Sequence, residues 1–273
     1  MSFATLIVYV DAEGEPGDRV RIAGTIADKF NATLIGLSAC MLRPPFVAEG
    51  VVIQDLTETD IKGLKAKLAE KGNWFRKVAG ADRRKIEWRS MVDFPTEALA
   101  REARSADLIV IGQRKGPGDA YDSLDPGGAI LKVGRPLLLV PEGVSELRAE
   151  HVVIGWKDTR EARRAVVDAL PFLQDATRVT IVEICRSGEE EAARERIDDV
   201  AHYLARHKVK GGPQVILHQN DTDAAQLIRL AQDERTDLLV VGAYGHTRLG
   251  EWVFGGVTRD LLRSSPVCCL MSH

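Results

Sequence analysis

The sequence feature that most constrains the fold is an internal repeat: three segments occur twice, in the same order along the chain. The pairs are residues 106–112 with 236–242, residues 31–40 with 176–185, and residues 6–11 with 152–158. Three matches in one order indicate a duplicated structural unit. A chain of 273 residues is long enough for two such units, each with its own core. We therefore predict one domain at residues 1–147 and a second at residues 148–273.

The predicted boundary lies near Leu147, because residues 141–147 are rich in turn-forming and polar residues. Within each unit, short apolar runs alternate with amphipathic segments, which predicts strands alternating with helices. The runs are nearly continuous, as in strands that are buried on both faces of a parallel sheet. The fold class is therefore α/β, with two tandem doubly wound, mostly parallel five-stranded sheets of Rossmann-like type and right-handed crossovers.

The expected elements are clearest in the second unit. Strands are predicted at residues 151–156, 178–184, 214–218, 238–241 and 267–271, and helices at 161–172, 189–207, 224–232 and after Gly256. The first unit follows the same plan, but residues 41–60 form a longer stretch with two prolines and a glycine. We expect a surface excursion there, followed by a helix at residues 61–78.

Composition limits the partners of the chain. A formal net charge of -3 offers no basic field for a nucleic acid or for an anionic membrane surface, so neither is expected as a partner. The four cysteines lie in or beside apolar runs without metal-site spacing, which favours buried, reduced thiols. The apolar N-terminal run lacks a basic region before it, and no run approaches the length of a membrane span. These features predict a cytoplasmic protein.

One loop carries the pattern of a ligand site. In open α/β sheets, ligands bind beyond the carboxyl ends of the strands. After the strand at residues 238–241 the chain has Gly242 and Gly245, then nine residues, then Gly255 and Gly256 at the start of a helix. Glycines let backbone N–H groups approach an anion, and a helix N-terminus adds unpaired donors, so a phosphate is the expected guest. Ordinary turn glycines are the alternative interpretation, since neither a P-loop nor a dinucleotide fingerprint is present.

The spacing Gly-x2-Gly-x9-Gly at the end of a fourth strand resembles the universal stress protein family, and the duplication resembles its tandem members. The resemblance implies an ATP or AMP site, with or without Mg. The residues that match the phosphate-holding positions are Gly242, Gly245, Gly255, Gly256, Val257 and Thr258. The family pattern usually has Ser or Thr where this chain has Gly256, so one hydroxyl contact is missing and Thr258 is the substitute at hand.

The resemblance also implies where the adenosine would lie. The family places an acidic residue after the first strand and an apolar residue at the end of the second, which here are Asp158 and Ile184. A carboxylate accepts hydrogen bonds from sugar hydroxyls or an amino group, and Ile184 with Val241 would enclose the base. The alternatives are that Asp158 caps the following helix and that Ile184 is a core residue.

The corresponding loop of the first unit departs from the pattern. After Gly112, Lys115 stands at the second glycine position, and the segment that follows contains three aspartates. Acidic groups repel phosphate. We predict that the first unit binds no ATP, or binds it weakly through Arg114 and Lys115.

The leading functional hypothesis is a cytoplasmic stress-response protein that binds an adenine nucleotide in its second unit and regulates through binding rather than turnover. No catalytic residue and no metal site are predicted. A slow ATPase or phosphotransferase is one alternative, for which the loop offers His246 and Thr258. A structural dimerisation module with a vestigial pocket is the other.

The resemblance implies pairing through the last strand of each unit, at residues 136–140 and 267–271. The chain would then be an internal pseudo-dimer, and this pairing would protect two apolar edge strands from aggregation. We also expect a homodimer of the whole chain.

Overall fold

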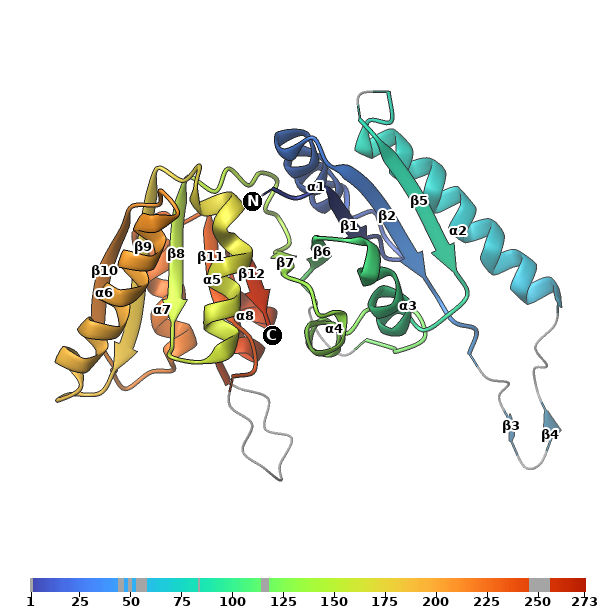
Figure 1. Ribbon diagram of the computed structural model, residues 1–273. Helices are drawn as coiled ribbons and strands as arrows, with labels where there is room; N and C mark the ends of the chain where they lie inside the picture. The colour runs from blue at the N-terminus through green and yellow to red at the C-terminus, as the bar shows by residue number, and fades with distance from the viewer. Residues whose placement is uncertain are drawn as a thin grey trace.

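The computed structural model describes residues 2–43, 47–48, 51–52, 58–82, 84–113, 118–245 and 256–273, and its strands and helices alternate through both halves (Figure 1). The first half contains β1 (Thr5–Tyr9), α1 (Gly17–Phe30), β2 (Thr33–Ala39), β3 (Val47–Ala48), β4 (Val51–Val52), α2 (Glu58–Ala79), β5 (Ile86–Met91), α3 (Pro95–Glu102), the 3-10 helix η1 (Ala103–Ser105), β6 (Leu108–Gly112), α4 (Pro126–Val133) and β7 (Leu137–Val140). The second half contains β8 (His151–Trp156), α5 (Arg160–Leu173), β9 (Arg178–Cys185), α6 (Glu190–Arg206), β10 (Gly211–Leu217), α7 (Asp223–Asp233), β11 (Leu238–Gly242), α8 (Gly256–Ser264) and β12 (Cys268–Ser272).

Ten strands of the described chain form one sheet, in the order β10-β9-β8-β11-β12-β7-β6-β1-β2-β5. Each half contributes five neighbouring strands to this sheet, and these strands pair in parallel within each half. This arrangement confirms the predicted doubly wound α/β class. The two five-stranded parts join edge to edge, because β7 and β12 pair antiparallel with Leu138 opposite Leu270. The expected pairing through the last strands is therefore present.

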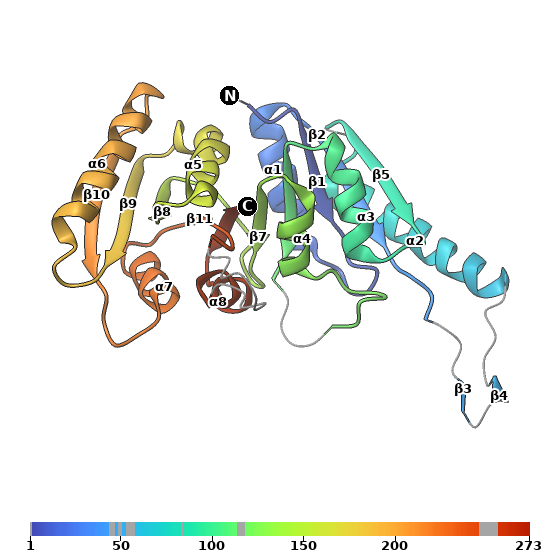
Figure 2. The same cartoon turned by 60° about the horizontal axis from the view of Figure 1, so that its bottom comes forward.

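Helices cover both faces of the sheet (Figure 2). One face carries α1, α2, α5 and α6, and the opposite face carries α3, α4, α7 and α8. Alternate residues of each strand point to opposite faces, so both faces of the strands are apolar. In β8, for example, Ile154 belongs to the first core and Val153 to the second. Both cores contain residues from both halves, so the sheet carries one continuous pair of cores.

A cluster of aromatic rings also joins the halves. Phe3, Phe30 of α1 and Phe172 of α5 contact one another, with ring centroids 5.1 to 5.8 Å apart. Lys29 forms an ion pair with Asp175 across the same junction, at 3.2 Å. Edge-to-face aromatic contacts of this kind add to the energy of area burial.

Two connecting segments, after β2 and between β7 and β8, are predicted to lie outside the sheet. The excursion after β2 contains a short antiparallel hairpin of β3 and β4, and α2 begins at Glu58, earlier than expected. The segment between β7 and β8 forms neither helix nor strand, and the domain boundary near Leu147 stays a prediction.

None of the helices in the described ranges has the length and apolar character needed to cross a membrane.

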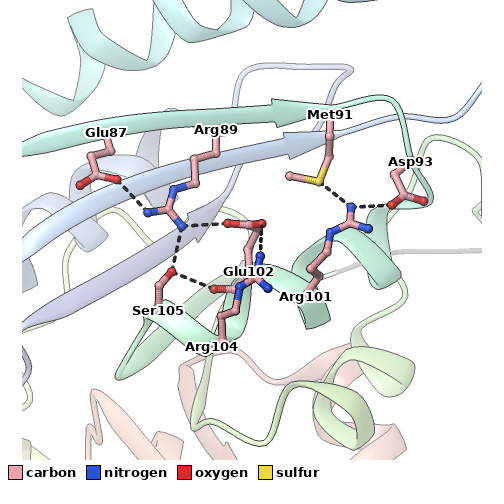
Figure 3. Close-up of polar contacts among 8 residues, drawn as sticks. All are labelled: Glu87, Arg89, Met91, Asp93, Arg101, Glu102, Arg104 and Ser105. Carbon is pink, nitrogen blue, oxygen red and sulfur yellow. Dashed lines mark hydrogen bonds and ion pairs between the residues drawn. The ribbon is translucent and has the colours of Figure 1, made fainter.

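The edge strand β5 is tied to α3 and η1 by a network of charged groups (Figure 3). Arg89 Nη1 donates to Glu102 Oε2 at 2.8 Å and to the hydroxyl of Ser105, and Arg89 Nη2 donates to Glu87 Oε2 at 2.8 Å. The Glu102 side chain is only 11% exposed. The hydrogen bonds that Arg89 donates to Glu87 and Glu102 raise the pKa of its guanidinium group. Charges on an edge strand also discourage pairing with other chains.

We predict that Arg89→Met lowers the free energy of unfolding by about 1–3 kcal/mol, because the buried Glu102 carboxylate loses its charged donor. Arg104→Met is the matched control, since Arg104 is 72% exposed and lies 3.6 Å from the same carboxylate. It should change stability by less than about 0.5 kcal/mol. Urea unfolding followed by circular dichroism measures both, and equal losses would contradict the assignment.

Candidate functional site

The pocket that collects most of the predicted site residues lies at the carboxyl ends of β8, β9 and β11, on the face covered by α7 and α8. Its volume is about 150 Å³. The lining residues are Gly155, Trp156, Lys157, Thr159, Ala162, Val182, Ile184, Asp223, Leu227, Val241, Gly242, Tyr244, Gly245, Gly256, Val257 and Thr258. Of the predicted residues, Ile184, Val241, Gly242, Gly245, Gly256, Val257 and Thr258 meet here, Asp158 lies elsewhere, and Gly255 lies outside the described residues.

The space in this pocket depends on Gly155. A Cβ atom added there would lie 3.0 Å from Val241 Cγ1 and 3.1 Å from Leu227 Cδ1. Val182 and Ile184 on the neighbouring strand complete the apolar walls. Because any side chain at residue 155 would fill the gap between these walls, glycine leaves a flat apolar slot at the end of β8.

Among the described residues of the first half, a tyrosine occupies the place that is equivalent to this slot. The strand registers equate Tyr9 with Gly155, since Leu6 faces Leu108 as Val152 faces Leu238. Tyr9 is fully buried, and its hydroxyl donates to the carbonyl oxygen of Ala39 at 3.1 Å. Burial raises the pKa of this hydroxyl. In the first half the Tyr9 side chain therefore fills the space that corresponds to the slot at Gly155.

The glycine turn after β11 lets α5 approach the sheet. A Cβ atom on Gly242 would lie 2.4 Å from the backbone nitrogen of Ala162, in the first turn of α5. A Cβ atom on Gly245 would lie 2.9 Å from Glu161 Oε2 and 3.0 Å from Thr159 Oγ1. These glycines thus have a packing role, and a larger residue at either position would displace the helix that borders the pocket.

The same contact is different in the first half. A Cβ atom on Gly112 would lie 2.1 Å from Nη2 of Arg19, a residue of α1. The Arg19 guanidinium donates to the carbonyl oxygen of Tyr9 at 2.7 Å and to Asp11 at 2.9 Å. A bulky, paired cation therefore stands where the small Ala162 stands in the second half.

The helix that follows each glycine loop also differs between the halves. In α4 the carboxylate of Asp125 accepts hydrogen bonds from the backbone N–H groups of Gly127 and Gly128, at 3.2 and 3.1 Å. The donors that a phosphate would use are thus already satisfied by an anion. In α8 a Cβ atom added at Gly256 would meet no described atom within 4 Å. Arg114 and Lys115, the predicted weak ligands of the first half, lie outside the described residues.

Thr258 and Tyr244 hold the glycine turn against α8. The buried Thr258 hydroxyl accepts a hydrogen bond from the backbone N–H of Tyr244 at 3.1 Å. Tyr244 has a φ of 57°, in the left-handed region that non-glycine residues seldom adopt. Its hydroxyl lies close to Gly127 of the first half, and burial together with the nearby Asp125 raises its pKa to about 12.

The structure places Lys157, not Asp158, in the pocket lining. Asp158 lies on the other side of β8, where its carboxylate pairs with Arg163 at 2.5 Å. It does not cap α5 either, because Thr159 is the N-cap residue and accepts from the backbone N–H of Ala162. The strand register equates Lys157 with Asp11, so the acidic position of the first half is basic in the second.

Glu161 lies beside the glycine turn of the pocket, and the sequence pattern did not single it out. Its side chain is 4% exposed. Burial alone would raise its pKa, but hydrogen bonds from Arg160, from its own backbone N–H and from Thr159 outweigh burial, so the pKa lies below its usual value. An ionised carboxylate near the first turn of a helix is also favoured by the helix dipole.

The depressed pKa of Glu161 predicts how stability depends on pH. The ionised form contributes its stabilisation above the unfolded pKa of about 4.3, and this contribution is lost as pH falls through the lower folded value. Glu161→Gln should therefore lower the free energy of unfolding by about 1–3 kcal/mol at pH 7, and the difference from wild type should shrink below about pH 4.

Urea titrations from pH 7 to pH 3 provide the measurement, with the exposed Glu195→Gln as control, which should follow wild type throughout. A Glu161→Gln deficit that is constant over this range would show that its carboxylate charge is not the stabilising feature.

Among the described residues, no group of His, Cys, Asp and Glu is arranged to hold a metal ion. The four cysteines are buried and unpaired with one another. His246, the residue considered for hydrolysis, lies outside the described residues. The features that this site offers to a ligand are thus an apolar slot, a nearby glycine turn and a helix N-terminus.

These features define an α/β chain with two doubly wound halves and an apolar pocket beside the glycine turn of the second half. Residues 150–273 match the family model described as Universal stress protein family. The second half of the chain therefore belongs to this family. No curated protein matches the sequence.

Solved structures extend the similarity in fold to the whole chain. A universal stress protein from Archaeoglobus fulgidus DSM 4304 is 12% identical, with 98% of this chain and 97% of that chain covered and a TM-score of 0.76. A protein of unknown function from Pseudomonas aeruginosa PAO1 is also 12% identical, with 99% and 92% covered and a TM-score of 0.61. A universal stress protein from Archaeoglobus fulgidus in complex with dAMP is 20% identical, with 51% and 98% covered and a TM-score of 0.34. The full-length match to the first of these structures shows that the chain has the fold of a tandem universal stress protein.

Proposed function

We propose that the second half binds an adenine nucleotide, ATP or AMP, and that the chain acts in the stress response through this binding rather than through turnover. The observation that carries the proposal is the slot at Gly155. It opens between apolar walls beside the glycine turn and the start of α8, whereas Tyr9 fills the equivalent place in the first half.

The residues of the pocket suit the parts of such a ligand. The walls formed by Val182, Ile184, Leu227 and Val241 match the apolar faces of a purine. Asp223 at the start of α7 offers a carboxylate acceptor for an amino group or for sugar hydroxyls, the role first expected of Asp158. Backbone N–H groups at the start of α8, near Gly256, are suited to a phosphate.

The proposal also covers the division of the chain into domains and its location in the cell. We propose a division of the chain near Leu147, in the segment without helix or strand between β7 and β8. We also propose a cytoplasmic location, supported by the slightly acidic composition and the four unpaired cysteines.

Isothermal titration calorimetry of the full chain with ATP and with AMP tests this function. We predict one nucleotide per chain, because Tyr9, Arg19 and Asp125 obstruct the first half. Gly155→Val should weaken binding by at least about tenfold, equivalent to about 1.4 kcal/mol, because the added methyl groups occupy the slot.

Gly212→Val is the matched control, since Gly212 lies on β10 and an added Cβ atom would meet only the Val179 carbonyl oxygen, at 3.8 Å. It should bind as wild type does. Thermal melting verifies that both variants are folded. No binding by wild type, two nucleotides per chain, or unaltered binding by folded Gly155→Val would each contradict the proposal.

A further inference from the structure

The charged residues of the pocket lining show how it could choose among ligands. Lys157 and Asp223 are the two charged side chains in the described lining. Asp223 already contacts His218, with its Oδ1 atom 2.8 Å from Nδ1 of the ring. No carboxylate among the described residues pairs with Lys157. The ammonium group of Lys157 is therefore the charge in the lining that a ligand can neutralise.

Lys157 follows β8 directly, next to the glycine turn. Gly155 faces Val241 in the parallel pairing of β8 and β11, and Lys157 and Ala243 each follow two residues later, just beyond the ends of these strands. Ala243 lies between Gly242 and Gly245, the residues that frame the turn. Thr159, two residues after Lys157, would contact a Cβ atom at Gly245. Lys157 thus lines the same pocket as the glycine turn and the start of α8, which are suited to an anion.

The neighbouring anion does not cancel this charge. Glu161 is buried beside Gly245, but it is paired with Arg160 and hydrogen-bonded to Thr159 and to its own backbone N–H. Its charge is therefore largely compensated within the first turn of α5. Arg160 itself is paired with Glu161 and is not among the residues that line the pocket.

The first half carries a residue of opposite charge at the equivalent position. There Asp11 follows the strand, and its carboxylate is engaged by Arg19. A carboxylate accepts hydrogen bonds from hydroxyl groups, whereas a lysine ammonium donates three and accepts none. The exchange of Asp for Lys therefore removes an acceptor for sugar hydroxyls and adds a point charge that favours phosphate.

Building on the proposed function, we infer that Lys157 is a specificity-determining residue that binds a ligand phosphate, so that the pocket selects among adenine compounds by their phosphate charge. The contact offsets the hydroxyl that is missing at Gly256. Affinity should then rise from adenosine to AMP to ATP, and it should fall with ionic strength more steeply for ATP than for AMP.

Calorimetry of the full chain with adenosine, AMP and ATP tests this inference. Lys157→Met should weaken ATP binding about tenfold while changing adenosine binding less than about twofold, and Lys157→Asp should weaken ATP binding further. Lys157→Arg should retain the preference for ATP over adenosine. Lys210→Met, which removes an exposed lysine before β10, controls for net charge and should behave as wild type.

The outcomes separate this inference from the proposed function. If wild type binds none of the three compounds, the proposed function itself fails. If wild type binds them and Lys157→Met leaves the ratio of ATP to adenosine affinity unchanged, the inference about Lys157 is wrong although nucleotide binding stands. Equal weakening of adenosine and ATP would also overturn it, because a structural disturbance of the pocket affects every ligand alike.

Discussion

The antiparallel pairing of β7 with β12 is the interaction on which the arrangement of the molecule depends. Both strands are buried and, apart from Ser272, apolar, and either of them alone would expose a row of unpaired backbone groups at a sheet edge. Pairing satisfies both edges at once and places the two halves back to back in one sheet. It also brings α4 against α8, which is why Tyr244 at the pocket touches Gly127 of the other half.

Within this shared frame, a few side chains distinguish the two halves near their glycine turns. Tyr9 and Arg19 fill the first half at the places where Gly155 and Ala162 leave room in the second. Asp125 satisfies the helix N-terminus that a phosphate would otherwise approach. The order of the five sheet strands is the same in both halves, so the proposed difference in nucleotide binding rests on side-chain volume and charge.

The fold was largely predictable from the sequence, because strands buried on both faces appear as continuous apolar runs and the repeat fixed their order. The glycine turn was also predictable, since few residues fit its close approach to α5. The repeat segments 6–11 and 152–158 differ in length by one residue, so the sequence alone does not fix which residue is equivalent to Asp11. The strand register shows that it is Lys157 and not Asp158. Successive residues of a strand point to opposite faces, so this offset of one residue moves the carboxylate away from the pocket.

The tyrosine that closes the first half could not be recognised from its type, because an apolar position at the end of a buried strand predicts core packing whether or not a pocket lies beside it. The contribution of Glu161 was equally hidden, since its contact with the glycine turn joins residues far apart in the sequence.

The continuous chain between β7 and β8 has a consequence for how such a protein changes over generations. In an assembly of two identical subunits, every substitution occurs twice and must suit both copies. Covalent linkage removes that symmetry, so a residue such as Tyr9 can favour rigidity in one half while Gly155 keeps space in the other. The linked pair can thus combine one half with a filled interior and one half with an open pocket, which two identical chains cannot do.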